Sequence, residues 1–80
     1  MIPIQDLLNK IKWDKRENPN KYTIFYLDRI KKELVQIPYT KMKRLEGSFM
    51  VLDNEEESSI PMHRIKRVEK SNAVVWERKL

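Results

Sequence analysis

The residues with the clearest chemical potential lie in the stretch "IPMHRIKRVEK", residues 60 to 70, which contains the one histidine of the chain. Arg64, Lys66 and Arg67 follow within four residues of His63. A guanidinium group offers a planar fork of donors that matches phosphate oxygens, and a neighbouring imidazole can donate to the same anion. The stretch therefore predicts phosphate binding, and a solvated surface turn is the alternative interpretation of His63 and Arg64.

A similar stretch, "IPYTKMKRLEGS", begins at residue 37, which is 23 residues before its counterpart at residue 60. It carries its own group of cations, which are Lys41, Lys43 and Arg44. Lys41 corresponds to Arg64, so it is a second candidate contact for phosphate. Two copies are too few for an open solenoid, so the repetition favours one strand–proline–strand unit used twice in a closed, pseudo-symmetric domain.

Aromatic residues lie near these cations, as in proteins that bind single-stranded nucleic acid, where rings stack on bases and cations track phosphates. The sequence neighbours are Trp13 with Lys12, Tyr26 with Arg29, Tyr39 with Lys41, and Trp76 with Arg78. Strand-like surroundings favour core packing for Tyr26 and Trp76. Trp13 and Tyr39 remain as candidate stacking residues, and Trp13 could equally cover the core.

Residue types that support catalysis are sparse in this chain. It has one histidine, no cysteine and a single glycine, and its one run of carboxylates, "DNEEE" at residues 53 to 57, falls where a hairpin turn is expected. We interpret that run as a solvated loop and expect neither a metal site nor a cofactor. A phosphoesterase that uses His63 is an alternative, although no partner for the imidazole is evident.

The balance of charge favours an anionic partner. The 80 residues carry a formal net charge of +5, and "DNEEE" alone holds four of the twelve carboxylates. A basic surplus of this kind is typical of proteins that bind a phosphate backbone, although it also serves solubility. The sequence lacks cysteine, a signal-like N-terminus and a long apolar run, so we expect a cytoplasmic protein with no membrane contact.

Hydrophobic spacing predicts the elements that must position these residues. A helix is expected over residues 3 to 12, because apolar residues recur at the spacing of one helical face, at Ile4, Leu7, Leu8 and Ile11. Alternating or β-branched patterns predict strands at 22–28, 33–37, 42–46, 49–53, 58–60, 65–70 and 73–78. Pro38 and Pro61 should each end a strand and begin a single helical turn. The predicted fold is α+β over residues 1–80, with one helix and about seven short antiparallel strands in a small barrel or bent sheet.

The ordered blocks "MIPIQDLLNKIKWD", "YLDRI", "SIPMHRIKRVEK" and "VVWERK" resemble the RNA cyclic group end recognition domain family, which is mainly archaeal. The resemblance spans nearly the whole chain. It implies a role in RNA processing, and it carries over the polar positions Trp13, Asp14, Asp28, Arg29, His63, Arg64, Trp76 and Arg78. Within this set, Asp14 and Asp28 are expected to orient Arg29 or Arg64, or to cap turns.

The leading functional hypothesis is therefore a non-catalytic module that binds a phosphate-bearing RNA end, such as a 2′,3′-cyclic phosphate. Its expected contacts are His63, Arg64, Arg29, Arg67, Lys66, Lys41 and Arg78. It would act alone or with RNA-processing enzymes in trans, since no fused catalytic domain is evident. The alternatives are a protein adaptor that presents its basic face to an acidic partner, and the phosphoesterase.

Overall fold

One helix begins the part of the chain that the computed structural model describes, which is residues 2–78. This helix, α1 (Ile4–Trp13), has an acidic residue, Asp6, in its first turn and basic residues in its last turn, as the helix dipole favours. Its buried side chains are the four predicted ones, Ile4, Leu7, Leu8 and Ile11. The predicted helix is confirmed, and a short 3-10 helix, η1 (Pro19–Lys21), interrupts the loop that follows it.

Four strands form the larger sheet. They are β1 (Tyr22–Leu27), β2 (Leu34–Pro38), β6 (Ile65–Lys70) and β7 (Ala73–Glu77), in the order β2-β1-β6-β7, and every pair is antiparallel. β1 is central, as its apolar residues on both faces predicted. Ser71 and Asn72 form the turn between β6 and β7, and both have the positive φ angles that tight hairpin turns require.

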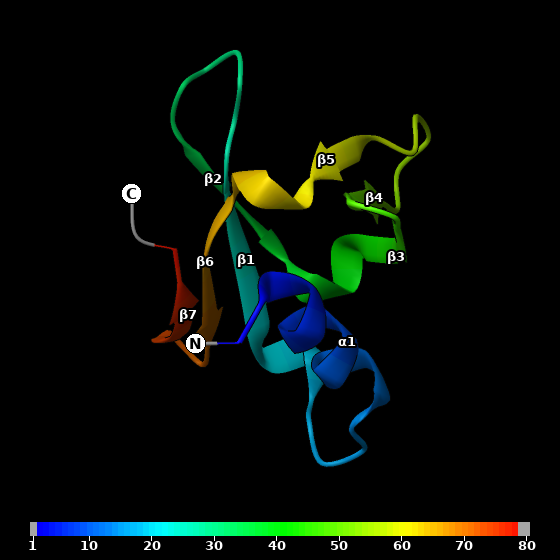
Figure 1. Cartoon of the computed structure of the whole chain (residues 1–80), viewed down its shortest axis with the longest axis vertical. Helices are drawn as coiled ribbons and strands as arrows, with labels where there is room; N and C mark the ends of the chain where they lie inside the picture. Colours follow the sequence, from blue (N-terminus) through cyan, green and yellow to red (C-terminus); the bar gives the residue numbers. More distant parts are fainter. Residues whose placement is uncertain (1, 79–80) are drawn as a thin grey trace.

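The smaller sheet is separate from the first. Its strands are β3 (Met42–Glu46), β4 (Phe49–Leu52) and β5 (Ser59–Pro61), in the order β3-β4-β5, again with antiparallel pairing. Figure 1 shows this sheet beside the larger one, with α1 below it. The expected helix and seven antiparallel strands are thus present in residues 2–78. Of the two predicted arrangements, a small barrel or one bent sheet, neither is formed, because the strands divide into two sheets that do not close.

The two prolines explain this division. Each ends an edge strand, where the missing N–H costs no ladder hydrogen bond. Each is followed by a 3-10 turn, which is η2 (Tyr39–Lys41) after Pro38 and η3 (Met62–Arg64) after Pro61. The first turn leads from β2 of the larger sheet to β3 of the smaller one, and the second leads from β5 back to β6. The equivalence of the two units stays a prediction, and one matched pair differs in burial, since Met42 is half-buried whereas Ile65 is fully buried.

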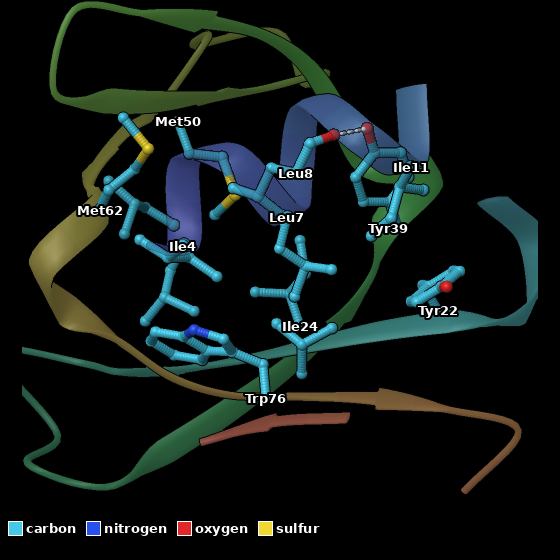
Figure 2. Close-up of a cluster of buried hydrophobic side chains, with 13 residues drawn as sticks. Ile4, Leu7, Leu8, Ile11, Tyr22, Ile24, Tyr39, Met50, Met62 and Trp76 are labelled. Atoms are coloured by element: carbon cyan, nitrogen blue, oxygen red, sulfur yellow. Dashed lines mark hydrogen bonds between the residues drawn. The ribbon is translucent and has the colours of Figure 1, made fainter. Parts of the chain in front are cut away.

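One apolar core joins α1 to both sheets (Figure 2). Leu8, Ile24, Met50, Ile65 and Val68 each have an exposed fraction of 0%. Two hydrogen bonds fix elements around this core, because the hydroxyl of Tyr39 donates to the carbonyl of Leu8 at 2.9 Å and Nε1 of Trp76 donates to the carbonyl of Ile2 at 2.8 Å. The core therefore fixes the η2 turn and strand β7 relative to the helix.

Candidate nucleic-acid interface

A pocket of about 310 Å³ lies where the β1–β2 turn meets η3. Strand pairing brings these segments together, because Tyr26 near the end of β1 lies opposite Ile65, the first residue of β6 after η3. Figure 1 shows the β1–β2 turn at one end of the molecule. We call this site the cation pocket, and it is lined by Leu27, Asp28, Arg29, Lys32, His63, Arg64 and Lys66.

The carboxylate of Asp28 is occupied by its own turn. Its Oδ1 accepts hydrogen bonds from the backbone N–H groups of Ile30 at 2.8 Å and Lys31 at 2.9 Å. These backbone hydrogen bonds lower the pKa of Asp28, and the positive charges of Lys31 and Arg64 add to the effect. Asp28 therefore caps the turn that presents Arg29, which was one of its two expected roles.

The cations of the pocket lack protein partners. In the described part of the chain, no hydrogen bond or ion pair engages the side chains of Arg29, Lys32, His63, Arg64 or Lys66. Five cations elsewhere in this part of the chain are paired with carboxylates, and their pairs are Arg16–Asp14, Lys43–Glu57, Arg44–Glu46, Arg67–Glu69 and Lys70–Glu17. Other unpaired cations, such as Lys31 and Lys41, do not line the pocket. The pocket thus gathers hydrogen-bond donors and positive charge that the fold itself does not use.

Arg78 binds the backbone of η3 and of the first residue of β6, next to the pocket. Its Nε donates to the carbonyl of Ile65 at 3.1 Å, and its Nη2 donates to the carbonyl of Met62 at 3.4 Å. The guanidinium also lies over the ring of Trp76, with 5.1 Å between its Cζ atom and the ring centroid. Two of its donors thus hold the η3 turn in place, and a direct RNA contact by Arg78 stays a prediction.

Two other expected phosphate contacts, Arg67 and Lys41, lie outside the cation pocket. The guanidinium of Arg67 lies over the Phe25 ring, with its Cζ atom 4.3 Å from the ring centroid, and its Nε is 3.1 Å from a carboxylate oxygen of Glu69. Lys41 is exposed on η2, the turn that leads into the smaller sheet. The structure brings together Arg29, His63, Arg64 and Lys66 in one pocket, and neither Arg67 nor Lys41 lines it.

The two expected stacking residues are also outside this pocket. Tyr39 is only 5% exposed and its hydroxyl is bonded to Leu8, so its stacking role is wrong in this fold. Trp13 is 73% exposed at the end of α1. The segment after α1 lies at the opposite end of the molecule from the β1–β2 turn (Figure 1). Trp13 therefore offers a free ring, but not at the cation pocket.

Asp14 does not orient a pocket cation. It pairs instead with Arg16, whose Nε lies 3.1 Å from its Oδ1. Hydrogen bonds from the side chain and the backbone of Arg16 lower the pKa of Asp14. Its Oδ1 also accepts the backbone N–H of Arg16 at 2.9 Å, so Asp14 caps its own turn, which was one of its two expected roles, and does not orient Arg29 or Arg64.

One residue of the pocket, Lys32, was missed by the sequence analysis. It lies in the charged turn "DRIKKE", residues 28 to 33, and has a φ of 55°. The turn was recognised as polar, but the register that places it beside η3 depends on the β1–β6 pairing, which joins segments far apart in sequence. A charged turn after a central strand was the available signal.

Within residues 2–78, no three histidine, cysteine, aspartate or glutamate side chains cluster as metal ligands would. No helix in the same range combines the length and apolar character needed to cross a bilayer.

Comparisons with known proteins place the chain in a family. The family described as "MJ1316 RNA cyclic group end recognition domain" matches residues 1–78. A UPF0248 protein of Metallosphaera sedula is 35% identical over 77 residues, which cover 96% of this chain and 94% of the relative. A UPF0248 protein of Saccharolobus islandicus strain L.S.2.15 is 31% identical over 80 residues, with 96% and 100% covered. No solved structure matches the chain. The chain therefore belongs to the MJ1316 RNA cyclic group end recognition domain family.

Proposed function

We propose that this protein is a non-catalytic RNA-binding module whose cation pocket holds the phosphate group of an RNA 3′ end. The observation that carries the proposal is the set of unpaired donors around one pocket, contributed by Arg29, Lys32, His63, Arg64 and Lys66. The family description, which names RNA cyclic group end recognition, supports the same ligand class.

The arrangement suits a cyclic phosphate because it offers directional donors as well as charge. A 2′,3′-cyclic phosphate carries one negative charge in a compact ring, whereas an open monophosphate can carry nearly two. Charge alone would therefore favour the open form. The planar forks of Arg29 and Arg64, with the exposed His63 that also lines the pocket, supply donors whose directions can select the ring.

The surroundings of His63 support binding rather than turnover. The imidazole is exposed, and no carboxylate or hydroxyl among the described residues is hydrogen-bonded to it. The one pocket carboxylate, Asp28, accepts backbone N–H groups and is therefore not available as its partner. A general base normally needs such an orienting group. Conversion of a cyclic-phosphate RNA end into an open monophosphate by the purified protein would instead establish the phosphoesterase.

The test compares RNAs that differ only in their terminal group. Arg64→Ala should weaken binding to a cyclic-phosphate end by about 1.5 to 3 kcal/mol, the cost of a lost charged hydrogen bond, and should weaken binding to a hydroxyl end much less. Lys31→Ala is the matched control, because Lys31 is an exposed cation of the same turn that does not line the pocket.

Three outcomes separate the hypotheses. A selective loss with Arg64→Ala and equal small losses with Lys31→Ala would support end recognition. Equal losses on both RNAs with Arg64→Ala would leave a general RNA-binding surface. Equal affinity for RNA and for an acidic peptide would favour the adaptor, and assembly with RNA-processing enzymes in trans would then depend on protein contacts alone.

A further inference from the structure

A second, larger pocket of about 470 Å³ adjoins the cation pocket. The two share Leu27, Asp28, Arg29 and Arg64, so these residues lie between neighbouring pockets. The second pocket extends from this shared edge toward the smaller sheet, where Leu52 and Ser59 line it. Whatever anion Arg29 and Arg64 hold would therefore have its attached group next to this space.

Apolar side chains that the core leaves partly or largely exposed line the second pocket. Tyr26, at the end of the central strand β1, is half-buried and lines it. Ile30 also lines it and is 90% exposed, although its neighbours Arg29 and Lys31 are charged. A nucleoside is held by a ring on which its base stacks and by apolar contacts that cover the base. Tyr26 and Ile30 offer these two kinds of contact beside the cations.

The one side-chain amide among the described residues that line this pocket is not free to read base identity. The amide of Asn54 is already used, since its Oδ1 accepts from the backbone N–H of Ser58 at 3.0 Å and its Nδ2 donates to the Ser58 hydroxyl at 3.3 Å. Stacking tolerates every base, because each has a π-face. The pocket thus favours the presence of a base over a particular base.

We infer that the second pocket receives the terminal nucleoside of the RNA, with its base against Tyr26 and Ile30 and its phosphate in the cation pocket. This inference rests on the proposed function, because the shared residues Arg29 and Arg64 set the position of the phosphate. It adds that end recognition requires a base on the last ribose, with a modest preference for purines, which stack more strongly.

The experiment uses four short RNAs in one binding assay with the full-length protein. Two end in a 2′,3′-cyclic phosphate and two end in hydroxyl groups, and in each pair the terminal ribose either carries adenine or lacks a base. For the cyclic-phosphate pair, we expect loss of the base to weaken binding about tenfold. Ile30→Ser should weaken binding to the base-bearing RNA several-fold and leave the abasic RNA unchanged.

Control variants test whether the losses come from the pocket residues themselves. Val74→Ser removes an apolar side chain that is 52% exposed on β7, outside both pockets, so it should change neither RNA. Tyr26→Phe keeps the ring and should keep the preference for a base, whereas Tyr26→Leu should reduce it. Because Tyr26 packs against the core, the melting temperature of each Tyr26 variant is measured alongside, and Ile30→Ser decides the matter if Tyr26→Leu unfolds.

The outcomes distinguish this inference from the proposed function. Equal affinity for base-bearing and abasic cyclic-phosphate ends, with the cyclic phosphate still preferred over the hydroxyl, would overturn the nucleoside pocket alone. A preference for the base that is the same with and without the cyclic phosphate would overturn end recognition and retain the nucleoside pocket. An Ile30→Ser loss that is equal on base-bearing and abasic RNAs would also overturn the pocket.

Discussion

The turns η2 and η3 begin alike and end differently. Each follows a proline that closes an edge strand, and each begins with a buried residue, Tyr39 in η2 and Met62 in η3, which are 5% and 6% exposed. Each also leads into a strand whose second and third residues are adjacent cations, Lys43-Arg44 in β3 and Lys66-Arg67 in β6. The inner sides of the two turns therefore serve the same purpose, which is to anchor a crossover between the sheets.

The outer sides differ in how their charge is compensated. After η2, Lys43 lies 3.1 Å from Glu57, and Arg44 lies 2.9 Å from Glu46 and 3.3 Å from Glu57. After η3, Arg67 is likewise paired, with Glu69, but Lys66, the counterpart of Lys43, has no carboxylate partner among the described residues. Arg64 and its counterpart Lys41 are both unpaired in the same part of the chain, and only Arg64 lines the cation pocket. Sequence charge alone cannot distinguish these turns. The lesson is that a cation indicates a binding site only when the fold leaves it unpaired.

The largest expected difference between the turns is in stability, at the residue that follows each one. Ile65→Ala should lower the free energy of unfolding by about 2 to 5 kcal/mol, because Ile65 is completely buried in the core. Met42→Ala should cost clearly less, because Met42 is half-buried. Denaturant unfolding of both variants measures the difference, and equal losses would mean that the two turns are anchored equally.

A second expected effect is alkaline destabilisation of the core beside η2. The Tyr22 ring packs near Tyr39, with 6.5 Å between the centroids. Burial, with a hydrogen bond that the Tyr22 hydroxyl donates to Glu17, raises the pKa of Tyr22 to about 12 from an ordinary value of 10.0. A raised folded-state pKa means that the stabilisation is complete below pH 10 and is lost as the pH rises toward 12.

The measurement is the free energy of unfolding across that pH window in the wild type and in Tyr22→Phe. The wild type should lose roughly 2 kcal/mol more than the variant, since each pKa unit corresponds to about 1.4 kcal/mol. Other tyrosines and lysines titrate in both proteins and cancel in the difference. Parallel curves for the two proteins would contradict the assigned role of Tyr22.

The smallest expected effect concerns the salt dependence of RNA binding. If about four phosphates are contacted, the slope of log affinity against log salt should be near −3 for single-stranded RNA, at about −0.7 per phosphate. Glu57→Gln removes the one carboxylate partner that Lys43 has among the described residues, whereas Arg44 keeps Glu46, so the slope should steepen by up to about 0.7. The extra affinity should be the same for cyclic-phosphate and hydroxyl ends. An unchanged slope would show that pairing with Glu57 does not prevent these cations from contacting phosphates.

Local patterns predicted the elements well because each has a local cause. The spacing of apolar residues in α1, the alternation in β1 and the prolines before η2 and η3 all act within a few residues. The division into two sheets was not predictable in this way. It depends on which distant strand pairs with the strand after each proline-led turn, as β6 pairs with β1.

The site was predictable only in its residue types. His63, Arg64 and Lys66 were recognised from one stretch, and the resemblance added Arg29. Sequence could not show that Arg78 is engaged by backbone carbonyls. It predicted that "DNEEE" is a solvated loop, which the exposure of residues 53 to 57 confirms, but it could not show that Glu57 from this run pairs with cations of the strand after η2. Pairing of charges is a long-range property, so it became visible only in the fold.

The most direct test of the central claim uses the matched residues of the two turns, Arg64 and Lys41. Both are cations at the third position of their turn, and only Arg64 lines the cation pocket. The measurement is the ratio of affinities for RNAs that end in a cyclic phosphate or in hydroxyl groups. Arg64→Ala should lower this ratio about tenfold or more, and Lys41→Ala should leave it unchanged. An equal change in the ratio for both variants, or no change for either, would contradict the account.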